Sequence, residues 1–157
     1  MNEKILVLTA TYNTYIDYGM VNNLDSTTFL LGLYTNREEA KNKELEYKAI
    51  VNSIKDVKQV IDYYNKNLRS SYAFDSEDCK SLDSDDAIKL FEFFDVKDFS
   101  ELEDGDSSLT DLFYDKAYDV LGFSVEPHES CAEWWIVFDL NDFSIGDTIE
   151  PYCLTNI

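Results

Sequence analysis

The sequence has few of the residues that common catalytic and metal sites require. It contains one histidine, and it lacks a glycine-rich phosphate loop, a nucleophile elbow and a His-Glu-x-x-His zinc motif. Its three cysteines, Cys79, Cys131 and Cys153, form no disulfide framework, which suits a reducing compartment. The N-terminus lacks a signal-peptide pattern, and the apolar runs are far shorter than the ~20 residues that span a bilayer. We therefore expect a cytoplasmic protein with no enzymatic activity, catalytic residue, cofactor or metal.

Basic residues are scarce in the second part of the chain. Residues 1–69 hold 9 basic and 9 acidic side chains, whereas residues 70–157 hold 4 basic and 23 acidic ones, so the whole net charge of −19 lies there. No lysine or arginine follows Lys116. Nucleic acids and anionic membranes require basic patches. The distribution therefore argues against both as ligands and favours a cationic protein partner.

Aromatic and aliphatic side chains are abundant. The chain is 45% hydrophobic and 15% aromatic, with 11 tyrosines and 10 phenylalanines. A disordered acidic tail would be poor in such residues. A length of 157 residues fits one domain and buries a sufficient core without disulfide or metal staples. We predict a single acidic domain over residues 1–157.

The first part of the chain predicts two strands followed by helix. Residues 4–12 and 27–34 are rich in β-branched and aromatic residues, with a polar hairpin connection at 13–26. Capping patterns at Thr35–Glu38 or Asn36–Glu39 predict a helix that runs to about residue 52. A second helical stripe covers residues 57–68. Because one helix of about 30 residues would be long for a domain, we predict a break near residues 52–56, with Ser53 as a possible cap.

The second part predicts shorter elements. The Ser- and Asp-rich residues 70–86 predict a loop or a poorly ordered segment, and residues 102–108 predict another loop. Ser84 would cap a helix over 85–94, and Ser107 or Ser108 would cap a helix that ends at Gly122. Strands are expected at 123–126, 133–140 and 148–154. The order predicts an α+β fold: a mainly antiparallel sheet of N- and C-terminal strands, with a central block of about four helices packed on one face.

Two segments resemble elements of small uncharacterised bacterial and phage domains. In FLLGLYTNREEAKNKELEYK, a strand ends in Gly-x-Tyr and Glu-Glu-Ala opens a helix after a short turn. The later EWWIVFDLND is similar to the aromatic strand that closes such domains. The resemblance covers roughly Lys4–Ala49 and Glu133–Asp142, and it implies no active site.

The last predicted helix has an acidic row. Asp111, Asp115 and Asp119 recur every four residues, flanked by Tyr114 and Tyr118. The opposite face is apolar and is expected to face the core. These residues are Leu109, Leu112, Phe113, Ala117 and Val120. Carboxylates at this spacing repel one another, and a cationic partner would relieve the repulsion, although an ordinary solvated face has the same pattern.

Neighbouring segments add further carboxylates to the candidate binding surface. They are Asp83, Asp85, Asp86, Glu101, Glu103, Asp104 and Asp106. Rows of carboxylates can imitate the phosphates of a duplex. We therefore predict an acidic inhibitor, a nucleic-acid mimic that occupies the basic nucleic-acid-binding surface of a target protein. In composition the chain resembles the phage anti-restriction and anti-CRISPR proteins of this kind. The alternatives are an immunity protein that neutralises a basic nuclease toxin and an acidic partner domain without inhibitory role.

The remaining candidates for chemistry are weaker. His128, beside Glu126, Glu129 and Cys131, suggests a metal site, a Cys–His nucleophile or a pH switch. One histidine without repeated ligand spacing favours a structural loop instead. The acidic loops do not fit an EF-hand, because placing Gly105 at its sixth position puts Leu102 at a ligand position. Solvated loops are favoured, and an irregular cation site stays open.

Overall fold

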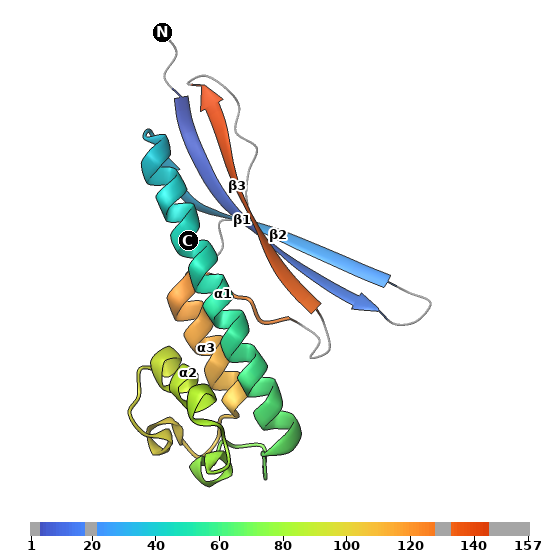
Figure 1. Cartoon of the computed structure of the whole chain (residues 1–157). Helices are drawn as coiled ribbons and strands as arrows, with labels where there is room; N and C mark the ends of the chain where they lie inside the picture. Colours follow the sequence, from blue (N-terminus) through green and yellow to red (C-terminus); the bar gives the residue numbers. More distant parts are fainter. Residues whose placement is uncertain (1–3, 18–21, 128–132, 145–157) are drawn as a thin grey trace. The chain divides into compact units, whose positions relative to one another are not determined.

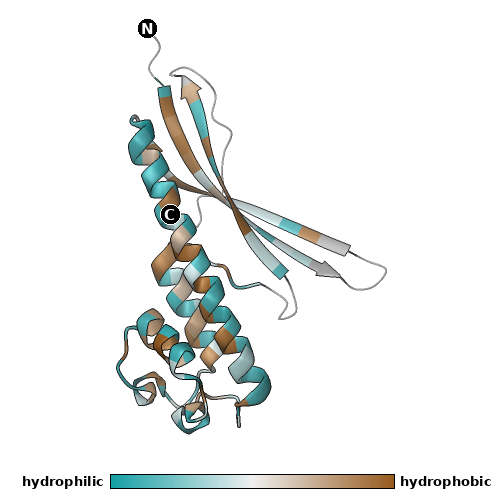
Figure 2. Ribbon diagram, viewed as in Figure 1, coloured by the Kyte–Doolittle hydropathy of each residue, from teal (hydrophilic) through white to brown (hydrophobic). Residues whose placement is uncertain are grey.

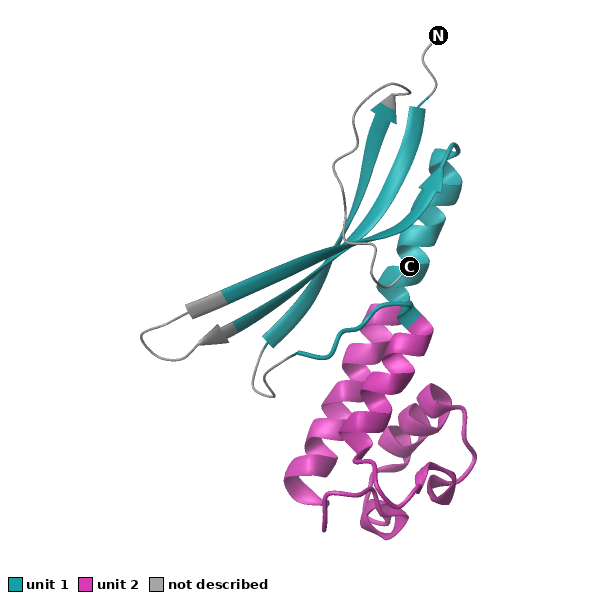
Figure 3. Ribbon diagram, turned by 180° about the vertical axis from the view of Figure 1, so that it is seen from behind, with its two compact units in different colours: residues 1–49, 121–157 teal, residues 50–120 magenta. Residues whose placement is uncertain are grey.

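The computed structural model describes residues 4–17, 22–127 and 133–144 (Figure 1). The chain divides into two compact units, coloured separately in Figure 3. Residues 1–49 and 121–157 form the first, called here the sheet unit, and residues 50–120 form the second, called the helical unit. The predicted α+β class is confirmed.

The sheet unit contains three antiparallel strands in the order β2-β1-β3. They are β1 (Lys4–Asp17), β2 (Asn22–Tyr34) and β3 (Glu133–Ser144). The expected pairing of N- and C-terminal strands is confirmed, because β3 lies along β1 from Lys4↔Ser144 to Tyr15↔Glu133. The predicted strand at 148–154 lies outside the described residues.

The hairpin is longer than the sequence predicted. Residues 13–17 and 22–26, which were expected to belong to a polar connection, are parts of β1 and β2, since the two strands stay paired as far as Asp17↔Asn22. The polar side chains instead bond to one another across the ladder: Ser26 Oγ donates to Asn13 Oδ1 at 2.6 Å. The prediction relied on alternating apolar residues and ended the strands too early. Polar side chains that bond across the two strands allow the β structure to continue.

Helix α1 (Arg37–Asn67) runs without interruption for 31 residues, so the predicted break near residues 52–56 is wrong. Asn36 caps it, since the Glu39 N–H donates to Asn36 Oδ1 at 3.1 Å, which selects the second of the two capping registers. A buried stripe continues through the supposed break at the spacing of one helix face. Its members are Val51, Ile54, Val57, Val60, Ile61 and Tyr64.

The first turns of α1 and the segment after residue 121 pack on the sheet within the sheet unit. The Tyr47 ring lies 6.0 Å from that of Phe138, and Phe29 stacks on Phe123 at 4.9 Å. The hydrophobic residues near the start of β1 (brown in Figure 2) are buried. Arg37 Nη2 donates to both carboxylate oxygens of Asp142 on β3, at 2.6 and 2.9 Å.

The predicted strand at residues 123–126 is wrong. This segment is irregular, and it buries the side chains of Phe123 and Val125. Tyr12 Oη donates to the Val125 carbonyl oxygen at 2.8 Å. The alternation of apolar residues, which resembled a strand, thus reflects two side chains inserted into the core without a backbone ladder.

In the helical unit, the remainder of α1 is joined by α2 (Ser84–Phe94) and α3 (Leu109–Leu121). The described residues therefore contain three α-helices instead of about four, because the first two predicted helices are one. Two short 3-10 helices, η1 (Ser76–Cys79) and η2 (Phe99–Leu102), lie in the connections. The Phe113 ring of α3 stacks on Phe93 of α2 at 5.4 Å.

The acidic connections of the helical unit have defined structure, contrary to the poorly ordered alternative. Three apolar side chains, Phe74, Cys79 and Leu102, are buried there. The Phe74 ring lies 5.6 Å from that of Tyr64, and the Phe74 N–H donates to the Ser107 carbonyl at 2.9 Å. Apolar residues spaced among the carboxylates thus anchor both loops to the core.

Two buried groups predict a loss of stability at alkaline pH. Burial raises the pKa of the Cys79 thiol from 9.0 to about 12, with added effects of Asp78 and Asp75, and burial raises the pKa of Tyr64 from 10.0 to about 12. Each group favours its neutral form in the folded state. Its stabilising contribution is therefore complete below the unfolded pKa and is lost as pH rises toward the folded one.

We expect the Tm to fall between about pH 9 and pH 12, and Cys79→Ala to make that fall shallower. One group can change the free energy of unfolding by up to about 1.4 kcal/mol per pH unit within its window. Thermal melts at intervals across this range measure the slope for both proteins. Parallel slopes for wild type and Cys79→Ala would show that the thiol does not titrate in this way.

Candidate protein-binding surface

The exposed face of α3 contains two of the three carboxylates of the predicted acidic row. Leu109, Phe113 and Ala117 are fully buried, whereas Asp115 and Asp119 are exposed. At 3.6 residues per turn, Tyr118 lies on the same side as these carboxylates, and it is 43% exposed. The predicted orientation of the helix is thus correct for these residues. Val120 departs from it: the core was expected to cover this side chain, but it is 40% exposed.

The third carboxylate of the row, Asp111, is part of the N-terminal cap of α3. Its N–H donates to Ser108 Oγ at 3.0 Å, and the Ser108 N–H donates to Asp111 Oδ2 at 3.2 Å. The Tyr72 hydroxyl also donates to this oxygen, at 2.7 Å. These hydrogen bonds, that of Tyr72 foremost, lower the pKa of Asp111 against the opposing effect of burial. Of the two predicted caps, Ser108 is the one observed. Asp111 stabilises the start of α3 through these hydrogen bonds in addition to contributing negative charge.

The sequence analysis did not predict that Tyr72 belongs to this surface. It precedes Asp111 by 39 residues and is 61% exposed. No local pattern links residues at that separation, so the sequence contained no signal for the pair. Tyr114, which was expected to flank the row, is half-buried, with its ring against that of Phe113 at 4.9 Å.

The carboxylates of residues 101–106 mostly bind backbone N–H groups. Glu101 Oε2 accepts from the N–H groups of Lys97 and Asp98, at 2.7 and 2.9 Å. Glu103 Oε1 accepts from Ser76 N–H at 2.6 Å. These two side chains close turns of the backbone, while their charge stays at the surface because both residues are exposed.

Of Asp104 and Asp106, only Asp104 uses its carboxylate to bind backbone N–H groups in this turn. Asp104 Oδ1 accepts from the N–H groups of Asp106 and Ser107, at 2.9 and 2.8 Å. The hydrogen bonds of Ser107 and Asp106 lower the pKa of Asp104, and those of Ser76 lower the pKa of Glu103. Both carboxylates therefore stay ionised to lower pH than usual. Asp106 contributes its backbone N–H to this turn, and the residue is exposed.

At the start of α2, Asp83 is the N-cap instead of the expected Ser84. Asp83 Oδ1 accepts from the Asp85 N–H at 2.8 Å. Asp85 is exposed and Asp86 is half-buried in the first turn. Negative side chains at a helix N-terminus interact favourably with the helix dipole. Asp83, Asp85 and Asp86 therefore stabilise the N-terminus of α2, which accounts in part for the acidic residues there.

The ion pairs identified in the described chain lie away from the carboxylates of α2 and α3. Ion pairs in the described part of the chain join the following residues: Arg37–Asp142, Lys43–Glu46, Lys48–Glu44, Lys58–Asp62 and Lys80–Glu77. None of them involves a carboxylate between residues 83 and 126. The ion pairs identified in residues 4–17, 22–127 and 133–144 thus leave the carboxylates of α2, α3 and their connection unpaired with basic side chains.

The residues considered for metal or nucleophile chemistry lie only partly within the described ranges. Within the described ranges, no three His, Cys, Asp or Glu side chains gather in a way that could hold a metal ion. Cys79 is buried, and its raised pKa keeps the thiol protonated and unreactive. His128, Glu129 and Cys131 lie outside the described residues. Of the helices that are described, none combines the length and hydrophobicity needed to cross a bilayer.

Comparison with known proteins gives no independent indication of function. No family model matches the sequence, and neither the curated proteins nor the solved structures searched contain a match.

Proposed function

We propose that the protein binds a basic, nucleic-acid-binding surface of another protein and inhibits it by occupying that surface. The supporting observation is the exposed face of α3, where Asp115 and Asp119 flank Tyr118 and have no basic partner within the described chain. Carboxylates of this kind compete with phosphates for the same Lys and Arg side chains. An exposed tyrosine adds apolar contact area at low entropic cost.

Capture from a host lysate tests the target class. Immobilised protein is expected to retain a nucleic-acid-binding protein at low salt and to release it at moderate salt, since surface charges are screened beyond about 8–10 Å at physiological ionic strength. Adding the acidic protein to the captured target should displace its nucleic acid in a binding assay. A target that binds nucleic acid equally well in the presence of the acidic protein would refute the inhibitory role.

The role of α3 is tested with the double variant Asp115→Asn/Asp119→Asn. Asp111 stays intact, because its removal would disturb the Ser108 cap and the Tyr72 hydrogen bond. We expect the association rate with the captured target to fall several-fold at low salt, with a weaker dependence on ionic strength, because steering charges act mainly on the on-rate. The dissociation rate should change less.

A matched control removes two exposed charges from the same unit. Asp56→Asn/Glu92→Gln changes α1 and α2 at exposed residues outside the ion pairs named above and leaves α3 untouched. Its association rate should lie close to that of the wild type. If both double variants slow association equally, net charge alone drives binding and the α3 face has no specific role.

A further inference from the structure

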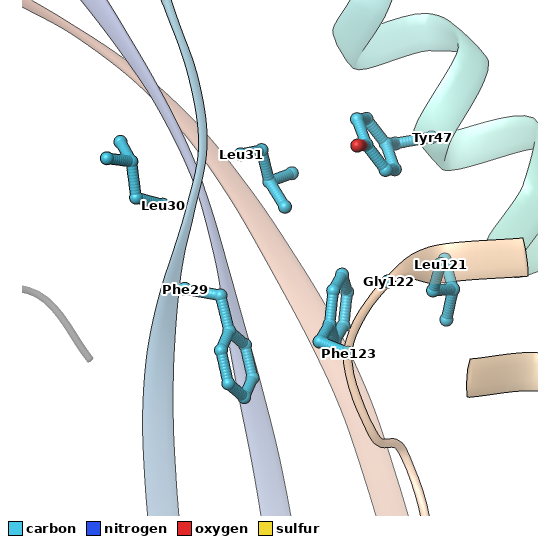
Figure 4. Close-up of a pocket in the computed structure, with 7 residues that line it drawn as sticks. All are labelled: Phe29, Leu30, Leu31, Tyr47, Leu121, Gly122 and Phe123. Atoms are coloured by element: carbon cyan, nitrogen blue, oxygen red, sulfur yellow. The ribbon is translucent and has the colours of Figure 1, made fainter. Parts of the chain in front are cut away.

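The sheet unit contains a half-open apolar pocket that the proposed function does not use. Its volume is about 170 Å³ (Figure 4). Phe29, Leu31, Tyr47, Leu121 and Phe123 provide its side-chain walls. No charged side chain is among the lining residues. The pocket lies on β2, α1 and the end of α3, all within the sheet unit.

An irregularity in β2 places Leu31 in this pocket. The register shifts between Leu8↔Gly32 and Thr9↔Leu30, so Leu31 is an additional residue in the strand. Figure 4 shows the Leu31 side chain on the side of Tyr47, whereas that of Leu30 points away. A bulge redirects a side chain in this manner.

A glycine with a positive φ lies at the rim of the pocket. Gly122 follows the last residue of α3 with φ of +82°, a backbone conformation that L side chains rarely adopt. An added Cβ at this position would meet no atom within 4 Å. The positive φ, and not a lack of space, therefore favours glycine at this helix end.

The walls are formed before any ligand arrives. Phe29 and Phe123 stack at 4.9 Å with 21° between their planes, and both are buried together with Leu121. Tyr47 is half-buried and Gly122 is exposed, so the pocket opens to solvent beside them. A ligand can enter without separating the core side chains.

We propose that this pocket binds a small apolar molecule of about the size of one six-membered ring. Apolar cavities of roughly 150 Å³ lined by Leu, Ile and Phe side chains remain dry and bind benzene. The described pocket has a similar volume and is lined by Leu and Phe side chains together with Tyr47, and it differs in being open to solvent on one side. Its lack of charged side chains disfavours anions and cations as ligands, and the stacked rings offer edges and faces to an aromatic ligand.

Benzene serves as the probe, with amide and methyl NMR shifts and the Tm as measurements. For the wild type we expect shifts confined to the residues around Phe29, Leu31 and Phe123, and a Tm rise of about 3–5 °C at ten times Kd. Leu31→Phe fills the pocket and should abolish both effects. The control, Leu33→Phe, adds the same volume on the same strand at an exposed residue and should bind benzene as the wild type does.

Tyr47→Trp provides a second test if Leu31→Phe does not fold, because it enlarges a half-buried side chain at the rim. It should weaken benzene binding at least tenfold. The proposal is overturned if benzene shifts no resonance of the pocket residues in the wild type. It is also overturned if either filled variant binds benzene with the affinity of the wild type.

Discussion

Phe113→Ala is expected to lower the free energy of unfolding of the helical unit by about 3–5 kcal/mol, the usual cost of removing a buried phenylalanine. The Phe113 side chain is fully buried, and its ring contacts Phe93 at 5.4 Å and Tyr114 at 4.9 Å. The substitution removes apolar area and leaves a cavity between α2 and α3. Both helices would lose the contact that joins them.

Chemical denaturation followed by circular dichroism measures this effect. The control is Tyr118→Ala on the same helix, where the side chain is 43% exposed and should cost well under half as much. The comparison separates loss of packing from loss of an aromatic residue as such. Equal destabilisation by the two substitutions would contradict the assignment of Phe113 to the core and Tyr118 to the surface.

Ser53→Pro is expected to destabilise the protein by about 3 kcal/mol or more, because proline inside a helix removes a hydrogen bond and clashes with the preceding turn. Ser53 is exposed and lies in the interior of α1. The position therefore tests backbone continuity without changing the core. If α1 were two helices separated near residues 52–56, a proline there would be tolerated.

Ser53→Ala is the matched control, and it should be neutral or slightly stabilising, since alanine has the highest helix propensity. Denaturation midpoints and helix content by circular dichroism distinguish the outcomes. Proline and alanine variants of equal stability would restore the two-helix interpretation. A large difference between them would support the 31-residue helix.

The sequence predicted those parts of the surface that depend on local spacing. The four-residue repeat of Asp115 and Asp119 placed both residues opposite Phe113, as the structure has them. The same repeat could not show that Asp111 accepts hydrogen bonds from Ser108 and Tyr72. Tyr72 reaches Asp111 only because the chain between them folds back over the aromatic core.

The errors in element boundaries have a related cause. The rule that long helices are rare predicted a break in α1, but a buried stripe through Val51, Ile54 and Val57 continues across the predicted break and stabilises the helix there. Residues 13–26 were predicted as a polar connection, yet residues 13–17 pair with 22–26 in the sheet, and Ser26 bonds to Asn13 across the two strands. Tertiary contacts thus overrode local propensity in both segments.

The sequence by itself determined the α+β class, the pairing of N- and C-terminal strands, the helix caps within one residue, and the concentration of negative charge after residue 69. These features follow from composition, periodicity and capping, which act over a few residues. Only the tertiary structure decided which side chains far apart in the sequence bind one another, whereas most bonds from carboxylates to backbone N–H groups join residues two to four apart. The hydrogen bond between the Ser76 N–H and Glu103, which are 27 residues apart, forms because packing brings two loops together. The spacing of residues along the chain does not predict such a contact.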